Sequence, residues 1–256
     1  MRRIIILSII LFGCNKSNDI VVADVIQNDN QPLTSSNVYI DDNGITIIAK
    51  ESAEIGDEVL VNGEEFIIVD EQMLRDMVNN GDDLSKVVTS KVFNMGDLFK
   101  GKPINGNISR WDVSNVDYMH SMFKDTSFNQ DISAWDVGNV YHFGAMFFNS
   151  SFNGDISAWD VTKSGNLLNG EVYENIGNTP VAITSMFANS AFNRDISSWN
   201  TSRIGSMNFT FNGAFNFNQD LSSWNVSQLF NCEEFWKGAD SWLLPKPNFT
   251  NCNPGQ

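Results

Sequence analysis

The chain is poor in the residues on which metal binding and nucleophilic catalysis usually depend. Its 256 residues include only two histidines, His120 and His142, and three cysteines. The sequence has no Cys/His cluster with metal-ligand spacing, no G-x-S-x-G motif, and no glycine-rich phosphate loop after a strand. Many aspartates lie near one another, so a carboxylate pair for glycoside hydrolysis stays open, although no pair stands out. The sequence therefore favours a protein that is not an enzyme and that holds no cofactor and no metal centre.

Basic residues are also scarce. Lysine and arginine total 16 against 31 aspartates and glutamates, which leaves a net charge of −15. A surface of this kind repels phosphate backbones and anionic lipid, so nucleic acid is not an expected partner. Cation binding and simple solubility both stay open as consequences of the negative charge.

No apolar run is long enough to form a membrane-spanning helix. The run Ile4–Phe12, broken by one serine, has nine residues, whereas a helix needs about 20 to cross a bilayer. Arg2 and Arg3 precede it, as in an export signal. It leads into Leu-Phe-Gly-Cys14, which resembles a bacterial lipobox, where the cysteine is lipidated. We expect residues 1–14 to be a lipoprotein signal peptide and lipid on Cys14 to anchor the chain; an ordinary export signal is the alternative.

Either signal directs the chain out of the cytoplasm, where disulfides persist. The two remaining cysteines, Cys232 and Cys252, both lie in the last 25 residues. Their pairing would close a loop at the end of the repeats described below and stabilise it by about 3 kcal/mol. We predict this disulfide, with two free buried thiols as the alternative.

Composition divides the next part of the chain into a tether and a small folded segment. Residues 15–36 are rich in Asn, Asp, Ser and Gln without apolar periodicity, and they are predicted to be a flexible tether. Within residues 37–82, short apolar runs are separated by the turn sequences Asp-Asn-Gly44 and Asn-Gly63, which predict hairpins. Asp70 can then cap a helix over Glu71–Asn79. This segment is expected to cover the first unit of the repeats.

Tryptophan recurs in one register along the rest of the chain. Successive intervals are 24, 24, 40 and 25 residues, and the tryptophans are Trp111, Trp135, Trp159, Trp199 and Trp224. A period in this range predicts units that bury a core by stacking on their neighbours. The repeats are expected to occupy residues 83–244 as about six coils, with an insertion loop at 163–180 and a cap tail at 245–256. We expect the chain to be monomeric.

Each unit carries apolar residues at a spacing close to that of leucine-rich repeats. Ile132, Trp135, Val137 and Val140 occupy positions i, i+3, i+5 and i+8 of one unit. Trp135 and Val137 would share the inner face of a short strand, and Val140–Phe147 has the apolar spacing of two helical turns. The predicted fold class is an α/β repeat, an atypical leucine-rich-repeat solenoid with a short parallel strand plus a short helix per coil and an N-terminal β-hairpin/helix cap. The indoles are expected in its core, with a sugar platform as the alternative.

Two sequence blocks resemble those of the BspA-like bacterial surface proteins. They are Phe128-Asn-Gln-Asp-Ile-Ser-Ala-Trp135-Asp-Val and Trp111-Asp-Val-Ser-Asn-Val116-x-x-Met119-x-x-Met122-Phe123. The repeat of that family, the mycoplasma-lipoprotein-type or 26-residue surface repeat, is an atypical leucine-rich repeat, and the resemblance covers about residues 83–244. It implies a lipid-anchored protein exposed at the bacterial cell surface, on the outer membrane, with a role in adhesion to host or matrix proteins.

Polar residues between the apolar positions are expected to form a binding face. The residue after each tryptophan is predicted to point outward, in a row made of Asp112, Asp136, Asp160, Asn200 and Asn225. Stacked carboxylates repel, so calcium is a candidate ligand, and accommodation by solvent and neighbouring polar groups is the alternative. A second set of candidates consists of aromatic residues outside the tryptophan register, Tyr118, Tyr141, Phe148, Trp236 and Trp242, which could make exposed contacts.

The function expected from these features is non-enzymatic binding at the cell surface. The row of polar side chains, together with the 163–180 loop, would present a surface to a protein or glycan of a host or neighbouring cell. A structural envelope or spacer lipoprotein without a specific ligand is the main alternative. A glycan-processing hydrolase is the remote one.

Overall fold

The computed structural model describes residues 36–162, 167–168, 171–172 and 180–255. The predicted signal peptide, the predicted lipidation site Cys14 and nearly all of the predicted tether lie outside the described residues. Most of the 163–180 insertion lies outside them as well. Within it the structure describes two short strands, β6 (Leu167–Leu168) and β7 (Glu171–Val172), which pair antiparallel.

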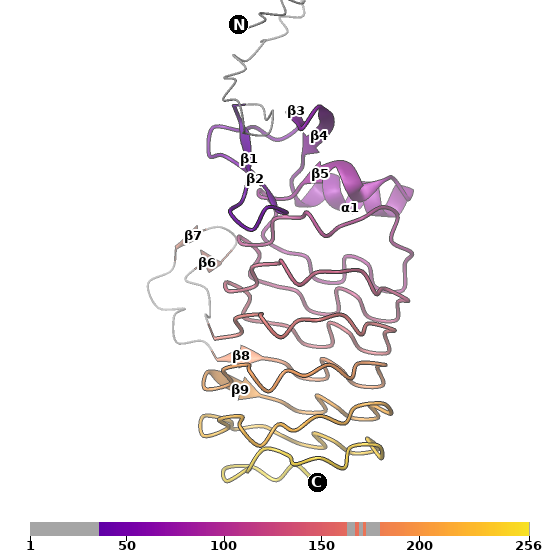
Figure 1. Cartoon of the computed structure of the whole chain (residues 1–256), viewed down its shortest axis with the longest axis vertical. Coiled ribbons are helices and arrows are strands. Elements are labelled where there is room, and N and C mark those ends of the chain that lie inside the picture. The colour runs from indigo at the N-terminus through magenta and orange to yellow at the C-terminus, as the bar shows by residue number, and fades with distance from the viewer. Residues whose placement is uncertain (1–35, 163–166, 169–170, 173–179, 256) are drawn as a thin grey trace, which may run out of the picture.

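An N-terminal module of two small sheets sits at one end of the repeats (Figure 1). β1 (Val38–Ile40) pairs antiparallel with β2 (Ile47–Ala49). β3 (Glu58–Val61) pairs antiparallel with β4 (Glu64–Ile68), which in turn pairs parallel with β5 (Val87–Val88). Asn62 and Gly63 both have positive φ in the tight turn between β3 and β4. Alternate residues of these strands, including Val59, Val61 and Phe66, form a separate small core.

One α-helix joins the module to the repeats. Helix α1 (Glu71–Asn80) begins after Asp70, whose side chain accepts a hydrogen bond from the backbone N–H of Met73 at 2.8 Å. It ends at Gly81, which adopts the left-handed conformation that stops a helix. A short 3-10 helix, η1 (Leu84–Lys86), follows. The buried face of α1 packs on the core of the first repeat units.

The prediction of an α/β leucine-rich-repeat solenoid is wrong. Among the described residues α1 is the only α-helix, and it precedes the repeats. The sheets of the described part are small, with two or three strands each, and none of them extends through the repeats. The segment around Trp135, predicted as a strand, is a pair of tight turns closed by hydrogen bonds from Trp135 N–H to Ile132 O and from Val140 N–H to Val137 O.

The segments predicted as helices do not form helices, because one residue inside each of them adopts the left-handed backbone conformation. Ser121, Ala145 and Ser185 have φ of 54°, 53° and 56°, in the left-handed region. Their N–H groups donate to carbonyl groups of the next unit, as Ser121 donates to Gly144 at 2.8 Å, rather than to a carbonyl four residues earlier. Each segment is therefore built from single turns, although its apolar side chains still point inward as a helix would place them.

The repeat units stack through scattered parallel bridges and backbone hydrogen bonds. Isolated bridges join Asn94 to Tyr118, Tyr118 to His142 and His142 to Ala182. Two short strands, β8 (Val181–Ala182) and β9 (Ile204–Ser206), continue this row in parallel, and Ser206 bridges to Asn231. Figure 1 shows the irregular coils lying one on another from the module to the C-terminal end.

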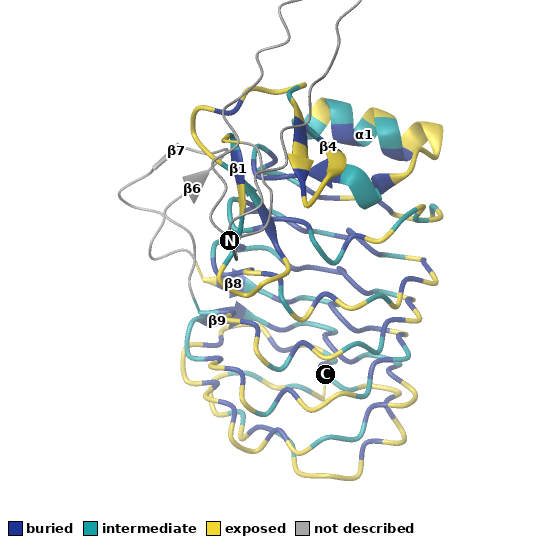
Figure 2. Cartoon of the chain, turned by 45° about the horizontal axis from the view of Figure 1, so that its top comes forward, coloured by how far each residue is buried: buried dark blue, intermediate teal, exposed yellow. Residues whose placement is uncertain are grey.

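The core is dominated by aromatic side chains repeated from unit to unit. Figure 2 shows buried residues recurring from coil to coil along the stack. The five tryptophans are each less than 5% exposed, so they do not form a sugar platform. The rings of Trp111 and Trp135 are stacked, with centroids 6.4 Å apart and planes 2° apart. Each indole N–H donates to a backbone carbonyl of the preceding unit, as Trp135 does to Ile108, so its burial leaves no polar atom unpaired.

The C-terminal end of the stack is closed by a covalent link. Cys232 and Cys252, which the sequence predicted to pair, are joined by a disulfide across 20 residues. Phe249, inside this loop, packs against the rings of Phe235 and Trp236. The last residues are thereby held against the end of the aromatic core.

Candidate functional site

The row of residues that follow the tryptophans has a local structural role. Each side-chain oxygen accepts a hydrogen bond from the backbone N–H two residues later, which closes a tight turn. Asp136, Asp160, Asn200 and Asn225 are exposed, as predicted for a binding face. Asp112 is instead only 2% exposed. The N-terminal module reaches this unit, with a hydrogen bond from Ile47 N–H to Arg110 O, and Asp112 belongs to the turn just beyond.

A second row of aspartates closes the preceding turn of each unit in the same way. The row consists of Asp131, Asp155, Asp195 and Asp220. The backbone N–H and hydroxyl of Ser157 lower the pKa of Asp155, and those of Ser197 lower the pKa of Asp195. Asp131 and Asp220 are held in the same way by Ser133 and Ser222. No group of three metal-binding side chains forms within the described parts of the chain. These carboxylates are therefore accounted for by turn structure that recurs in every unit.

An asparagine row links the units along another edge. The side-chain oxygen of Asn129 accepts from the backbone N–H of Asn153, that of Asn153 from Asn193, and that of Asn193 from Asn218, at 2.8–2.9 Å. Asn218 completes the row by accepting from Leu243 and Leu244. These side chains hold adjacent units in register and are not available as a ligand set.

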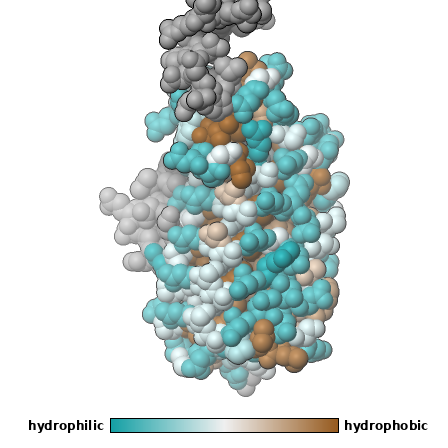
Figure 3. All heavy atoms as spheres, viewed as in Figure 1, coloured by the Kyte–Doolittle hydropathy of each residue, from teal (hydrophilic) through white to brown (hydrophobic). Residues whose placement is uncertain are grey.

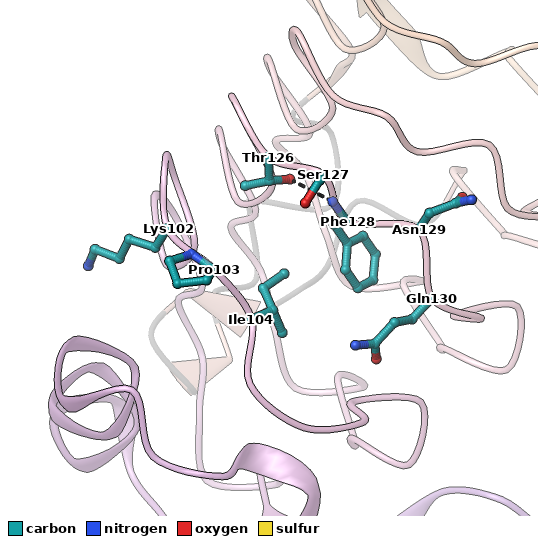
Figure 4. Close-up of a pocket in the computed structure, with 8 residues that line it drawn as sticks. All are labelled: Lys102, Pro103, Ile104, Thr126, Ser127, Phe128, Asn129 and Gln130. Atoms are coloured by element: carbon teal, nitrogen blue, oxygen red, sulfur yellow. Dashed lines mark hydrogen bonds between the residues drawn. The ribbon is translucent and has the colours of Figure 1, made fainter.

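A pocket of about 310 Å³ lies between the first two units of this edge (Figure 4). Ile104 and the buried ring of Phe128 line it, and Gln130 crosses to the earlier unit. The polar groups around it already have backbone partners: Gln130 bonds Gly106 O and Ile108 N–H, and Thr126 bonds Phe123 O. Lys102 extends away from the others in Figure 4 and donates to Asn79. We assign this pocket to packing between units.

Four aromatic side chains form a cluster on the outer side of the bridge row. This Tyr–His cluster consists of Tyr118 and His120 from one unit and Tyr141 and His142 from the next. The ring centroid of His142 lies 5.0 Å from that of Tyr118 and 5.1 Å from that of His120. The two tyrosine rings are 6.0 Å apart. All four side chains are partly exposed, so the cluster forms an aromatic patch at the surface.

Glycine makes room for these rings. A Cβ atom at Gly96 would lie 2.7 Å from Cε1 of Tyr118, and one at Gly144 would lie 2.5 Å from Cε1 of His142. Both distances are too short for any side chain, so Tyr118 and His142 rest directly against the backbone. The packing restrains the rings before any ligand arrives.

Burial also sets the ionisation of the cluster. It lowers the pKa of His142, and the neighbouring His120 lowers it further. Burial raises the pKa of Tyr118 and of Tyr141, with added contributions from nearby carboxylates. Nδ1 of His142 accepts from the backbone N–H of Gly144, whereas Nδ1 of His120 is buried without a partner among the described residues. The neutral forms of His142, Tyr118 and Tyr141 are therefore favoured near pH 7.

We expect this cluster to make stability pH-dependent. Because the pKa of His142 is lower in the folded than in the unfolded chain, its contribution is fully present above about pH 6.5 and is lost as the pH falls below that value. Urea unfolding at about pH 7.5 and about pH 5.5 should show lower stability at the acidic value. The difference should shrink in a His142→Gln variant, which stays neutral. Equal pH dependence in the two proteins would contradict this role of His142.

The sequence pointed to part of this site but not to its assembly. Tyr118 and Tyr141 were candidates for exposed contacts, and both are partly exposed in the cluster; of the others, Trp242 is buried and 3% exposed. From the sequence alone, His120 and His142 have no expected role. The missed signal was spacing, since Tyr118 and His142 are 24 residues apart, which is one repeat.

Comparison with known proteins gives a family for the chain. No helix in the described residues is long and apolar enough to cross a membrane. No curated protein and no solved structure matches the chain. A family model matches residues 71–175 and 173–251, which together make up most of the sequence. The chain therefore belongs to the family described as "Mycoplasma protein of unknown function, DUF285".

Proposed function

We propose that this protein is a non-catalytic binding protein of the bacterial cell surface, which holds a protein of a host or neighbouring cell at the Tyr–His cluster. The observation that carries the proposal is that the cluster departs from the repeat. At the positions of Tyr118 and His120, the other units carry small or polar residues: Asn94 and Gly96, Ala182 and Thr184, Ser206 and Asn208, and Asn231 and Glu233.

This departure from the repeat distinguishes residues that could serve a function from residues that every unit needs for its structure. The aspartate, asparagine and tryptophan rows recur because each unit needs them to close its turns or fill its core. At the position of Tyr141 the unit before the cluster and the last unit carry Phe93 and Phe230, so an aromatic ring there is not special to the cluster. The other units form without a ring at the positions of Tyr118 and His120, so the rings at those two positions need another explanation. Tyrosine is enriched among the residues that dominate protein interfaces, and rings already restrained by packing lose less freedom on binding.

The electrostatics of the acidic rows support a role without catalysis. A glycosidase needs one carboxyl whose pKa is raised, so that it is protonated and can donate to the leaving group. Hydrogen bonds from serine lower the pKa of Asp131, Asp155, Asp195 and Asp220 instead. These groups stay ionised and occupied by their own turns.

Location at the surface is part of the proposal and is supported by sequence. Arg2 and Arg3 followed by an apolar run and Cys14 are typical of an exported lipoprotein. The repeat motifs resemble those of BspA-like surface proteins, some of which are linked to adhesion.

The test is adhesion by cells that display the full-length chain, measured on immobilised extracellular-matrix protein. Tyr118→Ser and Tyr141→Ser should each weaken binding at least tenfold, which corresponds to about 1.4 kcal/mol. Tyr39→Ser is the matched control, because Tyr39 is 44% exposed and lies on β1 of the N-terminal module, outside the Tyr–His cluster. It should leave binding within about twofold.

Three outcomes would contradict the proposal. The cluster is not the contact if Tyr118→Ser and Tyr141→Ser variants, displayed at equal density, bind as well as the parent. Equal loss in the Tyr39→Ser variant would also remove the cluster as the specific site. If the parent chain adheres no better than cells without it, a structural envelope role replaces binding.

A further inference from the structure

A second site lies at the opposite end of the stack from the N-terminal module. A pocket of about 370 Å³ opens there between the loop at residues 237–240 and the tail residues Pro254 and Gly255. Trp236, which is partly exposed, and the edge of the buried Trp242 form its apolar wall. Lys246 and Asp240 are charged residues that line it.

Lys246 is placed unusually for a surface lysine. Its ammonium lies 5.0 Å from the ring centroid of Trp242 and 5.7 Å from that of Trp236. It donates one hydrogen bond, to the backbone carbonyl of Trp242 at 2.9 Å. In the described residues it makes no ion pair, although the chain carries a large excess of carboxylates. Partial burial lowers its pKa.

The neighbouring lysine shows the contrast. Lys237 also lines the pocket, but its ammonium pairs with the carboxylate of Glu234 and its side chain is 67% exposed. Lys246 therefore has no carboxylate partner among the described residues, whereas Lys237 is paired with Glu234 and well solvated. An anion at Lys246 would restore the interactions that this ammonium lost on burial.

The rest of the pocket restricts what that anion is. Trp236 offers an apolar surface of the size of a sugar ring, and the carboxylate of Asp240 accepts hydrogen bonds from hydroxyl groups. Asp240 and the net charge of −15 repel a dianion such as phosphate. A ligand with one carboxylate for Lys246, hydroxyls for Asp240 and a saturated ring for Trp236 satisfies all three.

We propose that this C-terminal pocket binds an acidic sugar, a pyranose ring bearing a single carboxylate such as a uronic acid, with its carboxylate on Lys246, its hydroxyls on Asp240 and its ring against Trp236. The site is separate from the Tyr–His cluster and would give the protein a second contact, to glycan. The disulfide between Cys232 and Cys252 holds the tail that forms one wall of the pocket.

The test is calorimetric titration of the full-length chain with glucuronate, glucose, acetate and inorganic phosphate. Glucuronate should bind at least tenfold more tightly than the other three, because glucose lacks the carboxylate, acetate lacks the ring and phosphate is repelled. Lys246→Met, which keeps the stem over the indoles but removes the charge, should lower glucuronate affinity at least tenfold. Lys100→Met removes an exposed, ion-paired lysine outside the pocket and is the control that should stay within about twofold of the parent. Lys246→Arg, which keeps the charge, should stay within about fivefold.

A second measurement uses the unaltered chain, in case Lys246→Met disturbs folding. Saturating glucuronate should slow the acetylation of Lys246 by an amine-reactive reagent, measured by mass spectrometry, and leave that of the exposed Lys100 unchanged. The proposal is overturned if glucuronate does not bind, if glucose or acetate binds as tightly, or if Lys246 is not protected. These measurements are independent of cell adhesion, so they can fail while the Tyr–His cluster still binds protein.

Discussion

Replacing Phe147 by alanine is expected to lower the free energy of unfolding by about 3–5 kcal/mol. The side chain is fully buried and lies at the centre of the aromatic core. Its ring centroid is 4.1 Å from that of Phe152, 5.6 Å from that of Phe123 in the preceding unit and 5.9 Å from that of Phe187 in the following one. Truncation would therefore open a cavity that touches three consecutive units, and neighbours held in register by hydrogen bonds cannot collapse into it.

The measurement is urea or thermal unfolding of the full-length chain, with a decrease of about 10 °C expected in Tm. Phe215→Ala is the matched control. Phe215 is 54% exposed, so the same truncation there should change stability by only about 0.5 kcal/mol. A Phe147→Ala variant as stable as the Phe215→Ala variant would show that the aromatic stack does not form the core.

Removing the disulfide is expected to destabilise the C-terminal end by about 3 kcal/mol. The link between Cys232 and Cys252 closes a loop with a sequence separation of 20 residues, and the loss of that constraint increases the entropy of the unfolded chain. Cys232 is buried at the end of the core, and Phe249 within the loop packs on Phe235. The tail should therefore detach when the covalent link is absent, and the last unit should open first.

Hydrogen exchange would locate this effect. The Cys232→Ser, Cys252→Ser double variant should lose amide protection beyond about residue 230, while protection near Trp135 stays close to that of the parent. A reducing agent should reproduce the loss in the parent and have no further effect on the double variant. Full protection of the last unit in the double variant would falsify a stabilising role for the disulfide.

Most of the interior was predictable because its chemistry repeats. Tryptophan and phenylalanine recur at a fixed period, and burying such large apolar surfaces is favourable in any stacked arrangement. The inward orientation of Trp135 and Val137 followed from this pattern. Their backbone did not, because an apolar spacing of two or three residues is produced equally by a strand and by a pair of tight turns.

The helices were wrong for a related reason. Ala145, Ser121 and Phe209 carry side chains that rarely adopt positive φ, so nothing in their identity marks a left-handed turn. Their conformation depends on hydrogen bonds to the next unit, as from Phe209 N–H to Glu233 O at 2.8 Å. The carbonyl groups that accept these hydrogen bonds belong to the next unit, so the sequence of one segment alone does not predict the turn.

The candidate sites also differ in whether they depend on local sequence or on contacts between units. The sequence placed Asp136 and Asp160 at outer positions, and their hydrogen bonds to the second following residue are local. It did not show that the N-terminal module reaches the unit in which Asp112 is buried. Nor did it bring Tyr118 and His142 together, because contact across a repeat requires the units to be stacked in register.

By itself the sequence determined the repeat period, the residues that fill the core and the pairing of Cys232 with Cys252. These features depend on side-chain chemistry and spacing. Only the tertiary structure decided the backbone path, the Tyr–His cluster and the pocket around Lys246. Each of these arises from groups brought together by stacking or by the return of the C-terminal tail, and the hydrogen bonds and ring contacts involved join residues that are distant along the chain.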